Sequence, residues 1–182
     1  AFLIGCSRNK SYIEDYEYGL LYTSNSGSVV SLYDKQGENL GEKNLNVSGI
    51  TFGSFMKNGI EVKDKLYYAA PLAGSNQQDF VVEMDKDKLS VSKIKSTGVT
   101  PTFFSSDGKY TFSGISSLNN SQIIKTDIEK NKVIGTNELE GQGINMIEDG
   151  NQLYILSINH NDSGKSTSGN LYTIDKSSFK VL

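Results

Sequence analysis

One strand-and-turn pattern occurs four times along the 182 residues of this chain. Each unit opens with an apolar run that contains a tyrosine, and these are Tyr22, Tyr67, Tyr110 and Tyr154. An aspartate closes a second apolar run in each unit, and these are Asp34, Asp85, Asp127 and Asp175. Successive tyrosines are 45, 43 and 44 residues apart, and successive aspartates are 51, 42 and 48 residues apart. A period of roughly 40–45 residues with several strands per unit predicts the blades of a β-propeller.

Each unit is expected to fold as a strand, a polar loop, a strand, an Asp-led turn and a strand. The first strands are predicted at 20–24, 66–70, 109–114 and 153–158, and the third strands at 89–94, 132–136 and 179–182. The second strands, such as 122–127 and 170–175, alternate apolar and polar residues, which predicts one buried face. The aspartate is expected to set the turn by accepting a backbone N–H two residues further on.

A fourth strand per blade is expected from the segment before each tyrosine. These segments are 50–56, 101–105 and 144–148. They are followed by Asn58-Gly59, Asp107-Gly108 and Asp149-Gly150. Asn-Gly and Asp-Gly predict hairpin turns, because both dipeptides favour the positive φ that a tight turn requires.

The units resemble the YVTN-type propellers, a bacterial seven-bladed group that is itself similar to lactonase and quinoprotein-like propellers. The third unit, SSDGKYTFSGISSLNNSQIIKTDIEKNKVIGT, carries the resemblance best. It has Asp-Gly-Lys, an aromatic strand, a polar loop, a strand ending in Asp and then Asn-Lys-Val. The resemblance covers about residues 18–182 and implies a ring of about seven blades. This chain would then supply an all-β part of that ring, with about four four-stranded blades.

The residues Leu3-Ile4-Gly5-Cys6 resemble the lipobox of bacterial lipoproteins, in which the cysteine becomes the lipidated N-terminus. Cys6 is the only cysteine in the chain, and a polar stretch follows it. We therefore expect residues 1–5 to be the remnant of a signal peptide, 6–18 a lipidated cysteine with its tether, and 19–182 an incomplete propeller. A lipid on Cys6 would hold the protein at the extracytoplasmic surface of a bacterial membrane. The alternative is a short apolar strand with an incidental buried cysteine.

Composition argues against a nucleic-acid partner. The net charge is −3 and the lysines are scattered, whereas phosphate neutralisation requires a basic stripe.

Three motifs resemble sites of chemistry, but none of them assigns a catalytic, metal-binding or cofactor-binding residue. The sequence 163–167 has the Gly-Lys-Ser end of a P-loop, but Asn159 stands where the first glycine is needed and a strand follows. His160 is the only histidine, and it lacks an evident nucleophile. The acidic pairs at 85/87 and 127/129 are interleaved with other residues and favour solvated turns over a calcium loop. No cofactor is expected.

Four phenylalanines, Phe52, Phe55, Phe103 and Phe104, fall on the strands expected nearest the ring axis. We expect these side chains to pack between blades, and not to line a ligand site, because propeller sheets bury both faces.

The leading hypothesis is a lipid-anchored lipoprotein whose propeller is a binding or scaffolding module for a protein or small-molecule ligand at the propeller face. A second hypothesis is a lactonase-like or quinoprotein-like enzyme whose catalytic residues lie in further blades. A third is an assembly role in which open strand edges pair with another chain.

Overall fold

The computed structural model of the protein describes residues 16–24, 27–45, 59–69, 80–95 and 101–182. All regular structure in these ranges is β-strand, with fifteen strands in four antiparallel sheets. Each sheet corresponds to one sequence unit, and we number them blade 1 to blade 4. Cys6, Phe52 and Phe55 lie outside the described residues. The predicted lipidation of Cys6 and the predicted packing of these two phenylalanines therefore stay predictions.

The strands of each blade are neighbours in the order in which they occur in the chain. Blade 1 has three described strands, β1 (Tyr18–Ser24), β2 (Gly27–Tyr33) and β3 (Asn39–Leu45). Blade 2 comprises β4 (Ile60–Val62), β5 (Lys65–Ala69), β6 (Phe80–Asp85) and β7 (Val91–Lys95). Blade 3 comprises β8 (Phe103–Ser106), β9 (Tyr110–Ser116), β10 (Asn120–Asp127) and β11 (Lys132–Glu140). Blade 4 comprises β12 (Gln142–Asp149), β13 (Gln152–His160), β14 (Ser166–Asp175) and β15 (Lys180–Val181).

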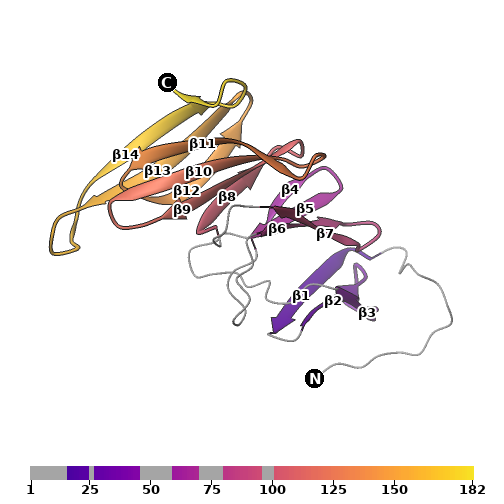
Figure 1. The fold of residues 1–182 in the computed structure, drawn as a ribbon. Coiled ribbons are helices and arrows are strands. Elements are labelled where there is room, and N and C mark those ends of the chain that lie inside the picture. The colour runs from indigo at the N-terminus through magenta and orange to yellow at the C-terminus, as the bar shows by residue number, and fades with distance from the viewer. Residues whose placement is uncertain (1–15, 25–26, 46–58, 70–79, 96–100) are drawn as a thin grey trace.

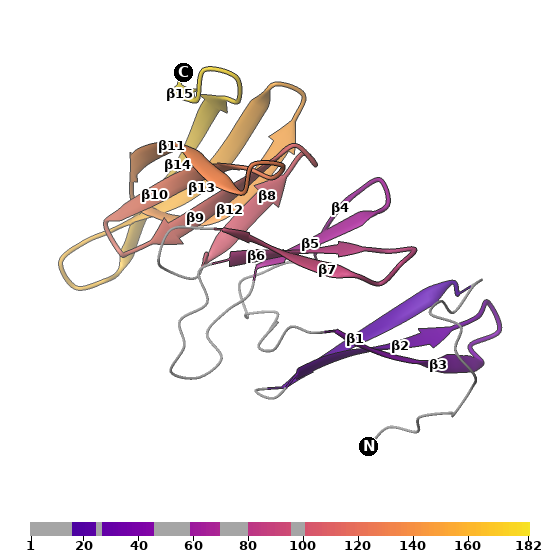
Figure 2. The ribbon, with the colours of Figure 1, turned by 45° about the vertical axis from the view of Figure 1, so that its right-hand side comes forward.

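The four blades follow one another in chain order as an open arc (Figure 1). The turned view in Figure 2 also places blades 1 and 4 at opposite ends of the row. This arrangement confirms the predicted all-β propeller with about four blades.

Among the described residues, the hydrophobic core forms three clusters, one at each contact between consecutive blades. Blades 1 and 2 share a cluster that includes Leu32 and Val82. Blades 2 and 3 share a smaller one around Tyr67 and Phe104, and blades 3 and 4 share the largest, around Phe112, Leu153 and Ile174. Burial of apolar surface contributes roughly 25 cal/mol per Å², so the blade contacts supply the main stabilisation of the arc.

The prediction that the second strand of a unit buries one face was wrong for β10. Ile123, Ile124 and Lys125 are consecutive, yet all three are buried. The reason is that blade 3 lies between two other blades, so both of its faces are covered. The prediction was correct for β14 of blade 4, where Ile174 is buried and Leu171 is 68% exposed.

The four tyrosines that first revealed the repeat do not occupy equivalent positions. Tyr67 and Tyr154 each pair with the residue two before the aspartate of their unit. Tyr110 pairs with the aspartate itself, and Tyr22 pairs with a residue five positions before it. The aspartate therefore marks the repeat more faithfully than the tyrosine does.

The aspartates do set the turns, as predicted, but their partner in blades 2 to 4 is one residue further along than expected. One carboxylate oxygen accepts the backbone N–H of the third residue on, at Lys88 (2.8 Å), Lys130 (2.9 Å) and Ser178 (2.7 Å). Asp34 of blade 1 instead accepts the N–H groups of Gln36 (2.9 Å) and Glu38 (2.8 Å). A short carboxylate side chain can satisfy turn amides within its own loop, so this chemistry is local.

Two of the three predicted fourth strands are confirmed. The predicted hairpin turn at Asn58-Gly59 is wrong. The segments 101–105 and 144–148 fall on β8 and β12, which turn at Gly108 (φ 81°) and Gly150 (φ 55°). The segment 50–56 lies outside the described residues. The first described strand of blade 2 is β4, and it joins β5 through Lys63-Asp64 rather than at Asn58-Gly59. Lys63 takes the positive φ of 56° there, which a tight two-residue hairpin requires whatever the residue type.

Each Asp-led turn ends on a left-handed residue, and Gly37 (φ 82°) of blade 1 gives a clean test of that requirement. A Cβ at Gly37 would meet no atom within 4 Å. Gly37→Ala is therefore expected to lower the free energy of unfolding by about 1 kcal/mol through backbone conformation alone. Chemical denaturation measures it, with Gly169→Ala as the control at a glycine outside the left-handed region. Equal stability of Gly37→Ala and wild type would contradict the assignment.

Candidate functional site

A cavity of about 650 Å³ lies where the first strands of blades 2, 3 and 4 come together. Its lining comes from β4, from β8 and the Asp107 turn, and from β12. The lining includes apolar residues such as Ile60 and Met146 and the acidic residues Glu61 and Glu148. Because three separate blades contribute, the cavity exists only when the blades are stacked. A mixed apolar and polar lining of this size suits a small molecule or a side chain of a partner.

Phe103 and Phe104 of β8 border this cavity, but both are buried and pack between blades. Phe103 belongs to the cluster between blades 3 and 4. Phe104 belongs to the cluster between blades 2 and 3. The predicted packing of these two residues between blades is confirmed, and both also belong to the lining of the cavity.

A buried lysine joins two carboxylates at one end of the cavity. The Nζ of Lys176, in the turn after β14, lies 3.1 Å from Asp107 and 2.5 Å from Glu148. Burial alone lowers the pKa of Lys176, but the hydrogen bonds to Glu148 and Asp107 outweigh burial and raise it above its ordinary value. The charged Lys176 therefore stabilises the fold fully below the ordinary pKa of lysine. This stabilisation is lost as the pH rises through the raised pKa of Lys176 in the folded protein. The backbone carbonyl of Lys176 also accepts a hydrogen bond from the buried Lys125.

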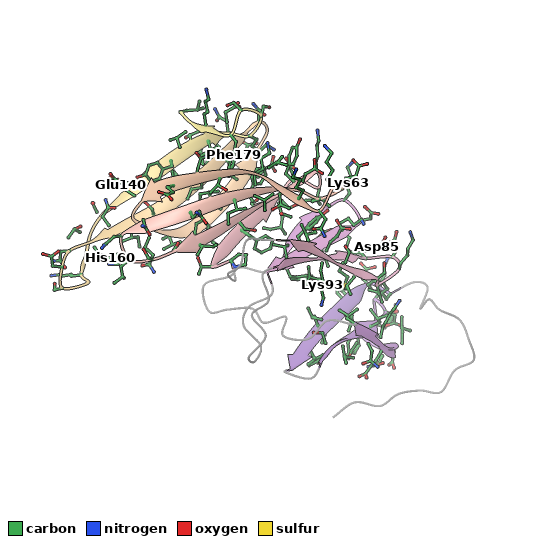
Figure 3. The ribbon with its side chains drawn as sticks, in the orientation of Figure 1. Lys63, Asp85, Lys93, Glu140, His160 and Phe179 are labelled. Atoms are coloured by element: carbon green, nitrogen blue, oxygen red, sulfur yellow. The ribbon has the colours of Figure 1, made fainter. Side chains whose placement is uncertain are left out.

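A second cavity of about 520 Å³ adjoins the first, since Lys63 and Asp107 line both. Figure 3 labels Lys63, which stands at the edge of blade 2. Within the second cavity Glu83 accepts hydrogen bonds from Lys65 (2.8 Å) and from the hydroxyl of Tyr67 (3.0 Å). Burial, and then the hydrogen bond to Glu83, raise the pKa of Tyr67. This cluster holds a carboxylate between two donors, an arrangement that fixes side chains rather than activating a nucleophile.

Alkaline pH is expected to destabilise the fold through buried phenols. Burial, followed by the charge of Glu61, raises the pKa of Tyr68 from 10.0 to about 12. The stabilising contribution of this neutral phenol is complete below pH 10 and is lost as the pH rises towards 12. Thermal melts across that range should therefore fall less steeply for Tyr68→Phe than for wild type. The exposed Tyr18 supplies the control Tyr18→Phe, and parallel curves for all three proteins would contradict the prediction.

Three buried hydroxyls face blade 2 from the interior of blade 3. Thr111, Ser113 and Thr126 have no hydrogen-bond partner for their side-chain oxygens among the described residues. All three are fully buried, and Thr111 and Thr126 are cross-strand partners. Neither sequence periodicity nor any motif indicated this polar patch.

His160 and the Gly-Lys-Ser sequence both belong to the β13–β14 hairpin. The ring nitrogens of His160 lie 3.1 Å from the carbonyl oxygen of Gly164 and 3.0 Å from the side-chain oxygen of Gln142. The turn is closed by Asn161, whose side chain accepts the N–H of Lys165 (2.9 Å). The strand β14 begins at Ser166, so residues 163–165 lie in the predicted loop and the last two residues of the sequence lie in the strand. Figure 3 labels His160 on the left of the view and Lys63 on the right, so the two residues lie well apart.

Within the described ranges, no group of three or more His, Cys, Asp or Glu side chains is placed to hold a metal ion. The same residues include no helix of the length and apolarity needed to cross a membrane.

Solved structures match the chain over most of its length. The hydrazine synthase of Kuenenia stuttgartiensis is 15% identical with a TM-score of 0.57, and the match covers 88% of this chain and 48% of that one. The Dos1 propeller is 12% identical with a TM-score of 0.54, covering 87% and 42% respectively. The Neurospora crassa Pan2 WD40 domain is 8% identical with a TM-score of 0.51, covering 90% and 50%. No protein-family model matches the chain, and no curated protein matches it in sequence.

Likeness at these identities shows the fold and not the activity. Two of the three matched structures are called a propeller or a WD40 domain, and the four stacked meander sheets agree with them. The chain spans half or less of the length of each of these proteins. It is an all-β chain with the β-propeller fold.

Proposed function

We propose that this chain is the binding or scaffolding module of a bacterial extracytoplasmic lipoprotein. Its ligand, a protein segment or a small molecule, contacts the propeller face at the cavity along β4, β8 and β12. The observation that carries the proposal is the lining of that cavity by three blades at once. Residues contributed by several repeats form a site whose shape depends on the repeats being held in register, which is how repeat folds present binding surfaces.

The side chains at the cavity support binding rather than a bond-making step. Glu61 pairs with Lys86, and both Asp107 and Glu148 pair with Lys176. Each of these carboxylates is thus engaged with a lysine, so the lining presents ion pairs and apolar surface. Such a lining recognises the shape and polarity of a ligand. The proposed ligand is not a nucleic acid, because the chain has a net charge of −3 and scattered lysines.

Site-specific photo-crosslinking in the producing cell tests the ligand face. Position 61 belongs to the lining of the cavity and its side chain is exposed, so a photoreactive residue is placed there, and one at position 118 is the control in the β9–β10 turn. We expect a discrete adduct from position 61 and none from 118. Adducts of equal yield at both positions, or none at 61, would overturn the placement of the ligand.

The membrane anchor is a separate part of the proposal and rests on the sequence Leu3-Ile4-Gly5-Cys6. A diacyl group on Cys6 adds about 0.8 kcal/mol of membrane affinity per buried CH₂, which is enough to retain the protein on a bilayer. Cys6→Ser is expected to move the protein from the membrane fraction to the soluble extracytoplasmic fraction. Unchanged fractionation of Cys6→Ser, compared with a silent Ser7→Ala control, would refute the anchor while leaving the binding face untested by that result.

A further inference from the structure

The contact between blades 2 and 3 has the smallest apolar cluster of the three contacts in the described part of the chain. Its cluster has four buried members, against seven between blades 1 and 2 and eight between blades 3 and 4. Burial of apolar surface is the dominant favourable term when sheets pack together. Among the described residues, apolar packing therefore stabilises this contact least.

Blade 3 presents buried hydroxyl groups to the same contact. Thr111, Ser113 and Thr126 are fully buried, and their side-chain oxygens have no hydrogen-bond partner among the described residues. Phe112 lies between the first two on β9 and packs toward blade 4, so the alternation of the strand places the hydroxyls toward blade 2. A buried hydroxyl without a partner gives up its bonds to water and gains none in return. Opening of this contact restores those bonds, which lowers the cost of opening.

The other two contacts are held by hydrogen bonds that cross from one blade to the next. Between blades 3 and 4, Lys125 donates to the backbone carbonyl of Lys176. Between blades 1 and 2, Lys43 donates to the backbone carbonyl of Lys88. Between blades 2 and 3 the described residues form no such bond, leaving aside three that do have partners, Tyr68, Lys93 and Asn131.

Both cavities lie along this contact. The first is lined by β4 of blade 2 and β8 of blade 3 together with β12, and the second is lined by blades 2 and 3. We propose that the contact between blades 2 and 3 is a hinge, at which the chain opens locally while the contacts on either side stay closed. Blades 1 and 2 move as one body and blades 3 and 4 as another, and both cavities widen as the hinge opens. Local opening of this kind costs less free energy than global unfolding and occurs where a fold is least stable.

Thiol labelling of the native chain tests the hinge with two matched pairs of variants. Val81 and Val82 are consecutive on β6 and fully buried, but Val81 packs in the contact with blade 3 and Val82 in the contact with blade 1. Ile123 and Ile124 are consecutive on β10 and fully buried. Ile123 packs toward blade 4, so Ile124 faces blade 2. Each of the four is replaced by cysteine in a Cys6→Ser background, which removes the only native thiol.

We expect Val81→Cys and Ile124→Cys to react with a maleimide about tenfold faster or more than Val82→Cys and Ile123→Cys, because only the first two become accessible when the hinge opens. Chemical denaturation checks that each variant is folded, and one pair decides alone if a member of the other does not fold. Equal rates within a folded pair, or faster reaction of its Val82→Cys or Ile123→Cys member, would overturn the hinge.

Removal of the unpaired hydroxyls should hold the hinge closed. Thr111→Val together with Thr126→Val keeps the side-chain shapes and removes two oxygens without partners, so the labelling of Val81→Cys should slow about tenfold. Thr167→Val, at an exposed threonine of β14, is the control and should leave the rate unchanged. Labelling that is as fast in the double valine variant as without it would contradict the part assigned to the hydroxyls. All of these rates are measured without a ligand, so a failure of the hinge and a failure of the proposed function are separate results.

Discussion

Phe103→Ala is expected to lower the free energy of unfolding by about 3–5 kcal/mol, the usual cost of removing a buried aromatic ring. The ring fills a socket between two glycines on different blades. An added Cβ would lie 2.1 Å from the ring at Gly114 and 2.4 Å from it at Gly143. The three atoms nearest to a Cβ at Gly114, and the two nearest to one at Gly143, belong to this ring, so the ring's loss leaves a cavity between blades 3 and 4. Chemical denaturation of the purified variant measures the effect.

The reciprocal change tests the socket from the other side. Gly143→Ala should cost about 1–3 kcal/mol because the methyl group overpacks the ring. In the Phe103→Leu background the cost of Gly143→Ala should shrink, since the smaller side chain leaves room. Gly169→Ala is the control, because its added Cβ lies at an ordinary 3.4 Å from the nearest atom. Additive losses in the double variant would show that Phe103 and Gly143 do not share this space.

Lys176→Met is expected to lower the free energy of unfolding by about 3–5 kcal/mol, the usual cost of removing one partner of a buried ion pair. The substitution keeps the length of the side chain but leaves the carboxylates of Asp107 and Glu148 facing each other without their cation. The Lys176 side chain is only 10% exposed, so water offers little compensation. Thermal and chemical unfolding both report the loss. Lys180→Met, at an exposed lysine four residues away, should be nearly neutral.

Neutralising the carboxylates separates lost charge pairing from lost packing. Adding Asp107→Asn and Glu148→Gln to Lys176→Met should recover part of the stability, because amides are neutral and can bond to each other. The same two changes in the wild-type background should be destabilising. If the triple variant is no more stable than Lys176→Met alone, repulsion between the carboxylates is not the cause.

Features governed by neighbouring residues were predictable from the sequence. The aspartate turns depend on a side chain and an amide three residues apart, so composition and spacing reveal them at once. The strands of blades 3 and 4 follow from apolar runs between turn residues, and their predicted positions were close to the observed ones. The β-propeller fold follows from four such units in succession.

Features governed by distant residues were not predictable. Asp107 and Lys176 are 69 positions apart, and nothing in either local sequence indicates the other. Nothing in the sequence around Gly114 and Gly143 indicates that the ring of Phe103 lies against both. The tyrosine repeat was misleading in register, because an aromatic residue suits several positions of a strand. Pairing across blades depends on how the sheets stack, and the stacking is a property of the whole arc.

The division of the interior into separate clusters between consecutive blades also bears on how such a chain changes over generations. Each cluster depends on two adjoining units and is indifferent to those beyond them. Duplication of one unit in the gene adds one cluster and leaves the rest intact, so length varies in steps of a whole blade. Each cluster can then change independently of the others, and the three clusters of this chain contain different side chains. A lineage of such proteins can therefore alter its blade count without ever passing through an intermediate that lacks a packed interior.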